Sequence, residues 1–351
     1  MEKVQLIGAD LATLQELMST LKEPPFRAKQ IMQWIYHRGR FDFQQMGNLP
    51  KTLRDKLDEA ASIELPRVAA RRISRDGTHK YLLQLEDGAT IEAVFIPEGN
   101  RRTLCVSSQV GCPMDCRFCA TGTQGFRRNL TVGEMVGQVL AVQRDSKEKI
   151  TNIVLMGMGE PLANYEQVMG AIRLWNDPLG LEIAARRLTV STCGLVPGIK
   201  RLSREGLQVV LAVSLHAPND ELRNQIMPIN RRYNLAQLMK ACREYVETTN
   251  RRITFEYALM RNFNDSSEHA RQLAQLVKGI LCHVNLIPLN PVAAHGWASS
   301  TKEQVLLFQK ELAKHNIEAT IRAERGADIE AACGQLKSRL GGKEGGNEHS
   351  G

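Results

Sequence analysis

The sequence predicts an α/β protein, in which helices cross between the strands of a parallel sheet. From residue 103 onward, short apolar segments rich in β-branched residues alternate with longer segments of helical period. Before residue 63 the period is helical, and between residues 66 and 98 it changes to that of strands. Such alternation is typical of an open doubly wound sheet or of a barrel. Both place functional side chains at the carboxyl ends of the strands.

The composition is that of an ordinary globular protein. The chain has 351 residues, of which 43% are hydrophobic and 24% charged, so repeats of collagen type and long disorder are excluded as its main body. The mean hydropathy is −0.28, and no apolar run reaches the ~18 residues of a membrane span. The N-terminus lacks a secretory pattern. We therefore expect a soluble, cytoplasmic protein with no membrane contact, and a monomer, because nothing indicates an obligate dimer.

Residues 1–62 are predicted to form a small helical accessory domain. Leucines recur at helical spacing over 11–21, after Asp10 as a possible N-cap. A second helix is expected over 26–36, and Pro50 opens a third. Residues 63–98 are predicted to link this domain to the core through a β-hairpin, whose strands cover 81–85 and 90–96.

The catalytic core is expected over residues 99–340, and the Gly-rich tail 341–351 is expected to be disordered. The predicted strands cover 103–109, 151–157, 187–193, 208–215, 252–259, 283–289 and 317–323. The predicted helices cover 131–145, 164–176, 196–205, 234–248, 266–279 and 301–315.

The charge is moderately basic. Lys and Arg number 46 against 38 Asp and Glu, a formal net charge of +8. Many basic residues are adjacent pairs: Arg71-Arg72, Arg101-Arg102, Arg127-Arg128, Arg186-Arg187, Arg231-Arg232 and Arg251-Arg252. Pairs of this kind occur on solvated surfaces and also in nucleic-acid footprints, and the sequence alone leaves both interpretations open.

Three cysteines form the most informative motif. Cys112, Cys116 and Cys119 follow the first predicted core strand with the spacing C-x3-C-x2-C. Three thiolates on one short loop can reach three corners of an iron–sulfur cube, which leaves one iron open to a small molecule. The alternative is a structural zinc site, which needs four ligands. No partner pair of C-x2-C or H-x3-H type occurs elsewhere in the chain.

Polar residues follow several later strands. Gly157, Gly159 and Glu160 end the second core strand in the run Met-Gly-Met-Gly-Glu-Pro, where glycines allow a ligand to approach the backbone. Ser191, Ser214, His216 and Asn290 stand at further strand ends. Each could be a local cap or turn. Their recurrence at one edge of the sheet favours a ligand site.

The cysteine loop and the Gly-Glu-Pro turn together resemble the radical S-adenosylmethionine (SAM) superfamily. Phe118 matches the aromatic residue common between its last two cysteines. The resemblance implies a partial (β/α)6 barrel and one [4Fe-4S] cluster held by Cys112, Cys116 and Cys119. It implies that the open iron chelates SAM, and that the cluster passes an electron that generates a 5′-deoxyadenosyl radical. A flavodoxin or ferredoxin is the expected donor.

Three further segments resemble the RlmN/Cfr family of RNA adenine methyltransferases: 104–112, 119–130 and 328–336. The resemblance covers nearly the whole chain, and Gly-Phe-Arg-Arg-Asn-Leu at 125–130 is similar to the RlmN branch. That branch methylates C2 of an adenosine in 23S ribosomal RNA near the peptidyl transferase centre, and in many bacteria an adenosine beside the tRNA anticodon. Cfr-type methylation at C8 is the alternative.

The family resemblance also implies residue roles. Cys333 takes a methyl group from one SAM and delivers it through a covalent RNA adduct. Cys105 resolves that adduct by forming a disulfide with Cys333, and Glu92 is the proton acceptor, although a surface charge would fit its position too. Six residues match positions that contact SAM: Gly159, Glu160, Ser191, Ser214, His216 and Asn290. Leu215 lies between them and is counted with the SAM site, where it could contribute through its backbone or packing alone.

Other assignments stay open at the level of sequence. A lone cysteine such as Cys333 is usually a buried apolar residue, but its polar, Gly-flanked surroundings suggest a loop. Cys193, Cys242 and Cys282 lie in predicted strands or helices, and we expect them to serve packing. The competing functions are a radical SAM enzyme that modifies a peptide or small molecule, and a non-catalytic RNA-binding protein with structural zinc.

Overall fold

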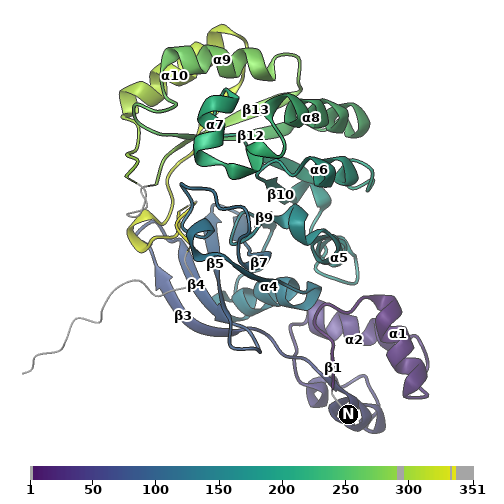
Figure 1. The fold of residues 1–351 in the computed structure, drawn as a ribbon. Helices are drawn as coiled ribbons and strands as arrows, with labels where there is room; N and C mark the ends of the chain where they lie inside the picture. The colour runs from purple at the N-terminus through teal and green to yellow at the C-terminus, as the bar shows by residue number, and fades with distance from the viewer. Residues whose placement is uncertain (1–2, 291–295, 333, 337–351) are drawn as a thin grey trace, which may run out of the picture.

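The computed structural model describes residues 3–290, 296–332 and 334–336. One sheet runs through the molecule, with the strands in the order β14-β13-β12-β11-β10-β9-β6-β5-β4-β3. Its first seven members are parallel and its last three antiparallel. Figure 1 shows the sheet curving between the N-terminal helices at one end of the molecule and α9 and α10 at the other.

The N-terminal unit has the three predicted helices: α1 (Leu11–Thr20), α2 (Arg27–Met32), which continues as a π-helix over Gln33–His37, and α3 (Lys51–Ala60). The Asp10 carboxylate accepts a hydrogen bond from the Thr13 N–H at 2.9 Å, so the predicted N-cap is confirmed. The sequence did not predict a short parallel pair, β1 (Val4–Gln5) with β2 (Ala61–Ser62), which joins the two ends of this unit.

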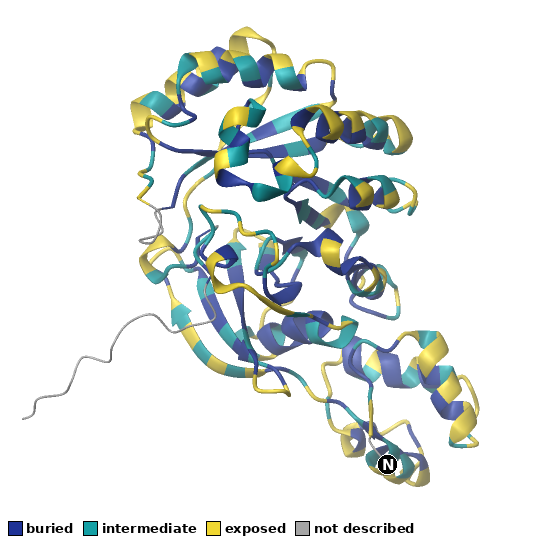
Figure 2. Ribbon diagram, in the orientation of Figure 1, coloured by how far each residue is buried: buried dark blue, intermediate teal, exposed yellow. Residues whose placement is uncertain are grey.

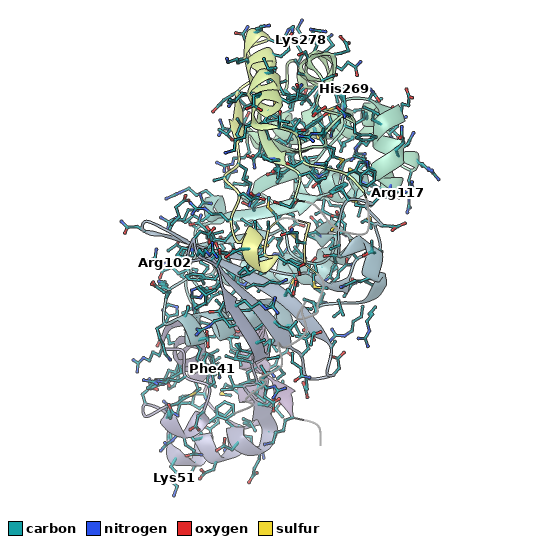
Figure 3. The ribbon with its side chains drawn as sticks, turned by 90° about the vertical axis from the view of Figure 1, so that its left-hand side faces the viewer. Phe41, Lys51, Arg102, Arg117, His269 and Lys278 are labelled. Atoms are coloured by element: carbon teal, nitrogen blue, oxygen red, sulfur yellow. The ribbon has the colours of Figure 1, made fainter. Side chains whose placement is uncertain are left out.

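The N-terminal unit packs directly on the first core helix, α4 (Val132–Ser146). Gly8 has φ +92° and lies so close to Gly133 that a side chain at either position would collide with the other segment's backbone. Figure 3 places Phe41 and Lys51 of the N-terminal unit far from Lys278 at the opposite end of the molecule.

The segment predicted as a hairpin linker is part of the core sheet. The hairpin itself is confirmed as β4 (His79–Gln84) and β5 (Thr90–Glu98), but β3 (Arg67–Ile73) extends it, and β5 pairs with the first core strand, β6 (Arg101–Cys105). The sequence missed β3 because it is an edge strand with no buried residue, in which exposed residues alternate with half-buried ones and three of the seven are arginines. The hairpin therefore positions its side chains against the barrel.

The parallel part has a strand–helix rhythm close to the predicted one. After β6, its strands are β9 (Asn152–Leu155), β10 (Leu188–Thr192), β11 (Val210–Ser214), β12 (Ile253–Leu259), β13 (Cys282–Pro288) and β14 (Ala319–Ile321). The helices after α4 are α5 (Tyr165–Asn176), α6 (Val196–Leu202), α7 (Asp220–Ile226), α8 (Leu235–Thr249), α9 (Ser267–Val277) and α10 (Lys302–Lys314). They cover the outer, convex face, with their dark-blue buried sides toward the strands (Figure 2).

Two local predictions in the core were wrong. The strand expected over 103–109 ends at Cys105, and the chain then forms a separate ribbon of β7 (Gln109–Gly111) and β8 (Phe126–Asn129). The short helix α7 was not expected, since it has fewer than three turns and gives a weak periodic signal. Both features border the cavity described below. The tail 341–351 lies outside the described residues, so the expectation of disorder there is not tested.

No helix in the part of the chain that the structure describes has the length and apolar character of a membrane span.

Candidate active site

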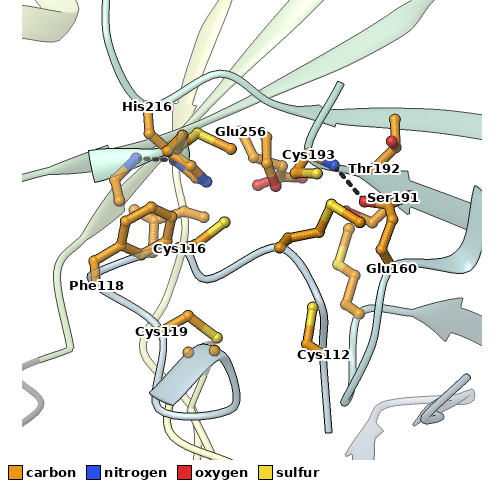
Figure 4. Close-up of a pocket in the computed structure, with 18 of the residues that line it drawn as sticks. Cys112, Cys116, Phe118, Cys119, Glu160, Ser191, Thr192, Cys193, His216 and Glu256 are labelled. Atoms are coloured by element: carbon orange, nitrogen blue, oxygen red, sulfur yellow. Dashed lines mark hydrogen bonds between the residues drawn. The ribbon is translucent and has the colours of Figure 1, made fainter. Parts of the chain in front are cut away.

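A cavity opens at the carboxyl ends of the parallel strands, the edge at which the sequence predicted a site. The cysteine loop forms one wall, and the ends of β9–β13 form the opposite wall (Figure 4). The predicted residues that line it are Cys112, Cys116, Cys119, Gly159, Glu160, Ser191, Ser214, His216 and Asn290.

The cysteine loop is held in place by its backbone. The Cys112 N–H donates to the Gly125 carbonyl at 3.0 Å, and the Cys119 N–H donates to the Cys116 carbonyl at 3.0 Å. Gly111 has φ +76°, and a Cβ there would collide with the same Gly125 carbonyl, so glycine is required at the entry to the loop. The β7–β8 ribbon thereby presents Cys112, Cys116 and Cys119 to one space.

The three thiols suit a multinuclear cluster. They surround an open volume in Figure 4, and among residues 3–290, 296–332 and 334–336 no three His, Cys, Asp or Glu side chains are placed to hold one metal ion. Cluster ligands bind different iron atoms and need not meet at one point. Burial raises the pKa of Cys112 to about 12, and it raises the pKa of Cys116 as well. Thiolates in this cavity therefore need the positive charge of bound iron.

The Gly-Glu-Pro turn packs against the segment that leads to the cysteine loop. Gly159 has φ +107°, and a Cβ there would lie 2.7 Å from the Gln109 side chain. The Glu160 carboxylate is buried and accepts N–H groups from Leu162 at 3.0 Å and Cys193 at 2.7 Å. Burial nevertheless raises its pKa. A carboxylate has lone pairs beyond these two bonds, so Glu160 can also accept a ligand ammonium.

His216 faces the cysteine loop. Its Nδ1 accepts the Ala258 N–H at 2.9 Å, which leaves Nε2 as the protonated nitrogen. Burial, with a smaller contribution from the Arg223 guanidinium, lowers the pKa of His216 to about 3, so the ring is neutral. Phe118 packs edge-on against it with ring centroids 4.7 Å apart. The pair gives the cavity an apolar wall with one N–H donor.

Leu215 differs from the other predicted SAM contacts. Its side chain is fully buried in the core and does not line the cavity. Its carbonyl accepts a hydrogen bond from Arg223 at 3.1 Å, so its contribution is through the backbone.

Several cavity residues were not singled out from the sequence. Glu256 of β12 is buried, lines the cavity and accepts a hydrogen bond from Asn285 at 2.8 Å. An acidic residue inside an apolar strand was the available signal. Arg223 is fully buried on α7 and donates to the Cys193 and Ser214 carbonyls at the ends of β10 and β11. It was missed because α7 itself was missed. Thr192 and Cys193 complete this wall, so Cys193 is buried but does not serve packing alone, as the sequence had led us to expect.

Two of the residues predicted for acid–base and thiol chemistry lie on the neighbouring strands β5 and β6, and neither is among the residues that line the cavity. Glu92 of β5 is 1% exposed, and its carboxylate pairs with the Lys80 ammonium at 2.9 Å. Cys105 is buried at the end of the neighbouring strand β6. Cys333 lies outside the described residues. Its neighbour Gly334 lines the cavity, and the Gly334 carbonyl accepts the Ala120 N–H at 2.7 Å.

This combination of a parallel α/β barrel with a three-cysteine loop and a Gly-Glu-Pro turn defines a radical SAM enzyme. The model of the radical SAM superfamily matches residues 106–274, and the model of the ribosomal RNA large subunit methyltransferase N-terminal domain matches residues 4–63.

Individual relatives are similar over almost their whole length. The chain is 49% identical to a dual-specificity RNA methyltransferase RlmN from Alcanivorax borkumensis, over 97% of this chain and 91% of the relative. It is 52% identical to a probable enzyme of the same name from Caldanaerobacter subterraneus, over 94% and 96%. A solved radical SAM methyltransferase from Sphaerobacter thermophilus is 47% identical and superposes with a TM-score of 0.92, covering 96% of this chain and 100% of that one. The chain belongs to the RlmN family of radical SAM RNA methyltransferases.

Proposed function

We propose that this methyltransferase adds a methyl group to C2 of an adenosine in 23S ribosomal RNA and of a tRNA adenosine beside the anticodon. The observation that carries the proposal is the convergence on one cavity of the three-thiol loop, the Glu160 turn and Gly334, next to Cys333 in sequence. A cluster, its SAM and the methyl-carrying residue can then act on a single base.

The target atom explains why so many groups are needed. C2 of adenine is an electrophilic amidine carbon with no lone pair to attack a methyl sulfonium, so direct polar transfer fails. When bound at Cys112, Cys116 and Cys119, a [4Fe-4S] cluster would supply the electron that generates a 5′-deoxyadenosyl radical from SAM, with a flavodoxin or ferredoxin as its donor. The protein residues bind SAM, carry the methyl group and move a proton.

Glu160 is the proposed partner of the SAM ammonium, because its buried carboxylate faces the cavity with acceptor capacity to spare. Ser191, Ser214 and Asn290 supply hydroxyl and amide groups around the same cavity. The neutral His216 supplies an N–H donor and, with Phe118, a flat apolar wall. These features suit an adenosine that carries a charged methionine.

Cys333 is the proposed carrier of the methyl group. The 5′-deoxyadenosyl radical would take a hydrogen atom from the S-methyl group, and the resulting methylene radical would add to C2 of the base. The adduct would then lose one electron, which the bound cluster can take back, and its C2 proton would pass to Glu92. The Cys105 thiolate would attack the Cys333 sulfur, so that a disulfide forms as the carbon–sulfur bond breaks, and the methylene carbon would take up a proton to become the methyl group. That disulfide must be reduced before the next turnover, so the two thiols need exchange chemistry.

The RNA is proposed to enter over the cysteine loop. Arg117, Phe126 and Arg127 are exposed on this loop and on the adjoining ribbon, and they offer phosphate partners and a stacking surface. The adenine must leave its stack to reach the cavity, at a cost of roughly a few kcal/mol. A loop or single-stranded substrate lowers that cost.

The identity of the product tests this proposal. Anaerobically reconstituted protein is incubated with SAM, reductant and either 23S ribosomal RNA or tRNA, and the digested nucleosides are separated by mass spectrometry against standards. We expect 2-methyladenosine from both RNAs. 8-Methyladenosine would instead establish the C8 reaction, and no methylated nucleoside from either RNA would contradict the function.

A Cys333→Ala variant separates the proposal from another kind of radical enzyme. It should form no methylated RNA, because its methyl carrier is gone. Full product from this variant would show that the chain uses a route without Cys333. The matched control is Cys242→Ala, since Cys242 is buried in α8 and does not line the cavity.

A further inference from the structure

Lys80 lies on strand β4 of the hairpin and contacts the loop of residues 326–332, called the C-terminal loop below. Its side chain is 8% exposed, and a buried ammonium is costly unless its donors are satisfied. The Nζ atom lies 2.9 Å from Oε1 of Glu92 and donates to the carbonyl of Glu330 at 3.0 Å. Lys80 therefore contacts the proposed proton acceptor and a residue three positions before Cys333.

The turn between β3 and β4 holds the C-terminal loop at two more points. The Ser74 hydroxyl donates to the Asp328 carboxylate at 2.5 Å, and the Gly326 N–H donates to the Asp76 carboxylate at 3.0 Å. A Cβ on Gly326 would lie 2.8 Å from the Ala331 side chain, so the loop is tightly turned here. Lys80 is the member of this set that also contacts Glu92.

We propose that Lys80 is a positioning residue that holds Glu92 and the loop of residues 326–332 in fixed positions relative to each other. Its ammonium lies 2.9 Å from the buried Glu92 carboxylate and supplies the opposite charge that a carboxylate needs in such a place. Its bond to Glu330 holds the loop, three positions before Cys333 in sequence, against the same ammonium. This inference rests on the proposed roles of Glu92 and Cys333, and it adds a residue that acts through both.

The energetic coupling of Lys80 to Glu92 is the first test. Lys80→Met removes the ammonium that pairs with Glu92. We therefore expect the rate of RNA methylation in a single turnover to fall by about 100-fold, which is a typical contribution of general-base catalysis to a rate. If Lys80 acts through Glu92, adding Lys80→Met to a Glu92→Gln protein should lower the rate of RNA methylation by less than about threefold further. A full multiplication of the two effects, or no effect of Lys80→Met alone, would overturn the proposal.

Methylation of Cys333 distinguishes this role from a collapsed active site. This half-reaction uses SAM and no RNA, so Cys333 of the Lys80→Met protein should still acquire the methyl group. The mass of the peptide that contains Cys333 measures this. Lys80→Arg retains a buried cation and should recover a large part of the RNA methylation. Failure of Lys80→Arg to exceed Lys80→Met would show that charge is not what matters at this position.

The loop contact is tested without any catalysis. In the full-length holoenzyme, hydrogen–deuterium exchange of the amides of 326–332 should rise several-fold in Lys80→Met and stay near wild type in Lys80→Arg. The matched control is Lys278→Met, at an exposed lysine far from the cavity (Figure 3), which should leave exchange and methylation unchanged. Unchanged exchange in Lys80→Met would overturn the loop contact, whatever the RNA product proves to be. A wild-type protein that makes no methylated RNA contradicts the proposed function instead.

Discussion

The parallel and antiparallel parts of the sheet support different halves of the proposed reaction. The parallel strands end in groups suited to a cluster and SAM, namely Glu160, Ser191, Ser214 and His216. The antiparallel strands β4 and β5 hold Lys80 and Glu92, which form a buried ion pair, and Lys80 also donates to the Glu330 carbonyl of the C-terminal loop. In the proposed reaction, radical generation belongs to the parallel strands, and proton transfer belongs to the antiparallel strands at the edge of the sheet.

The first and largest prediction tests the parallel part. Cys116→Ala removes a proposed cluster ligand, so RNA methylation should fall to background in an anaerobic assay with SAM and reductant. Cys242→Ala should keep full methylation and lose about 1 kcal/mol in the free energy of unfolding, since it removes only a buried sulfur. Methylation by the Cys116→Ala protein at the wild-type rate would contradict the assignment of the loop.

The second prediction tests the antiparallel part. Glu92→Gln keeps the shape of the side chain but removes its proton-accepting charge. RNA methylation should therefore fall by about 100-fold in single-turnover assays, while methylation of Cys333 persists in the peptide mass. If Glu92→Gln lowered the methylation of Cys333 as much as the methylation of RNA, the two parts of the sheet would not support separate half-reactions.

The sequence predicted the parallel part far better than the antiparallel part. β9, β11 and β12 follow from their largely apolar sequences, which are typical of strands buried on both sides, and β10 and β13 follow from the alternation of buried with half-buried residues. The sequence placed His216 and Glu160 at strand ends and so correctly predicted that they line the cavity. The edge strand β3 has no continuous apolar signal, and its arginines resemble a loop or surface segment.

The residues missed in the site depend on contacts distant in sequence. Lys80 is an ordinary lysine until the fold places Glu92 and Glu330 beside it, 12 and 250 residues away along the chain. Arg223 lies on a helix too short for a periodic signal. Tertiary proximity of this kind is absent from local sequence patterns.

The third prediction concerns the tie between the hairpin and the C-terminal loop. Burial alone would raise the pKa of Asp76, but N–H groups of Thr78 and Gly326 outweigh it and lower that pKa from 3.8 to about 2. A lowered carboxyl pKa stabilises the folded state above pH 3.8, and that contribution is lost as the pH falls toward about 2. Because Asp76 is exposed and screened by solvent, Asp76→Asn should cost about 1 kcal/mol at pH 7.

Urea unfolding of the two proteins between pH 2 and pH 7 measures this difference. The stabilities of the wild type and Asp76→Asn should converge toward the acid end of that range. A constant difference across the whole range would show that the charge of Asp76 does not stabilise the loop.

The fourth and smallest effect concerns the entrance to the cavity. Arg117 is exposed on the cysteine loop, so Arg117→Ala should weaken RNA binding by about threefold and lower the slope of log affinity against log salt by about 1. Lys278→Ala, at the far end of the molecule, should change neither quantity. Equal effects of the two substitutions would place RNA binding over the whole basic surface rather than at the parallel edge.

The most direct test of the account is the metal content of the protein purified and reconstituted without oxygen. A cluster on Cys112, Cys116 and Cys119 predicts about four iron and four acid-labile sulfide ions per chain, with one iron site that responds spectroscopically to SAM. Stoichiometric zinc without sulfide would contradict it, because none of the radical chemistry proposed for this cavity could then occur.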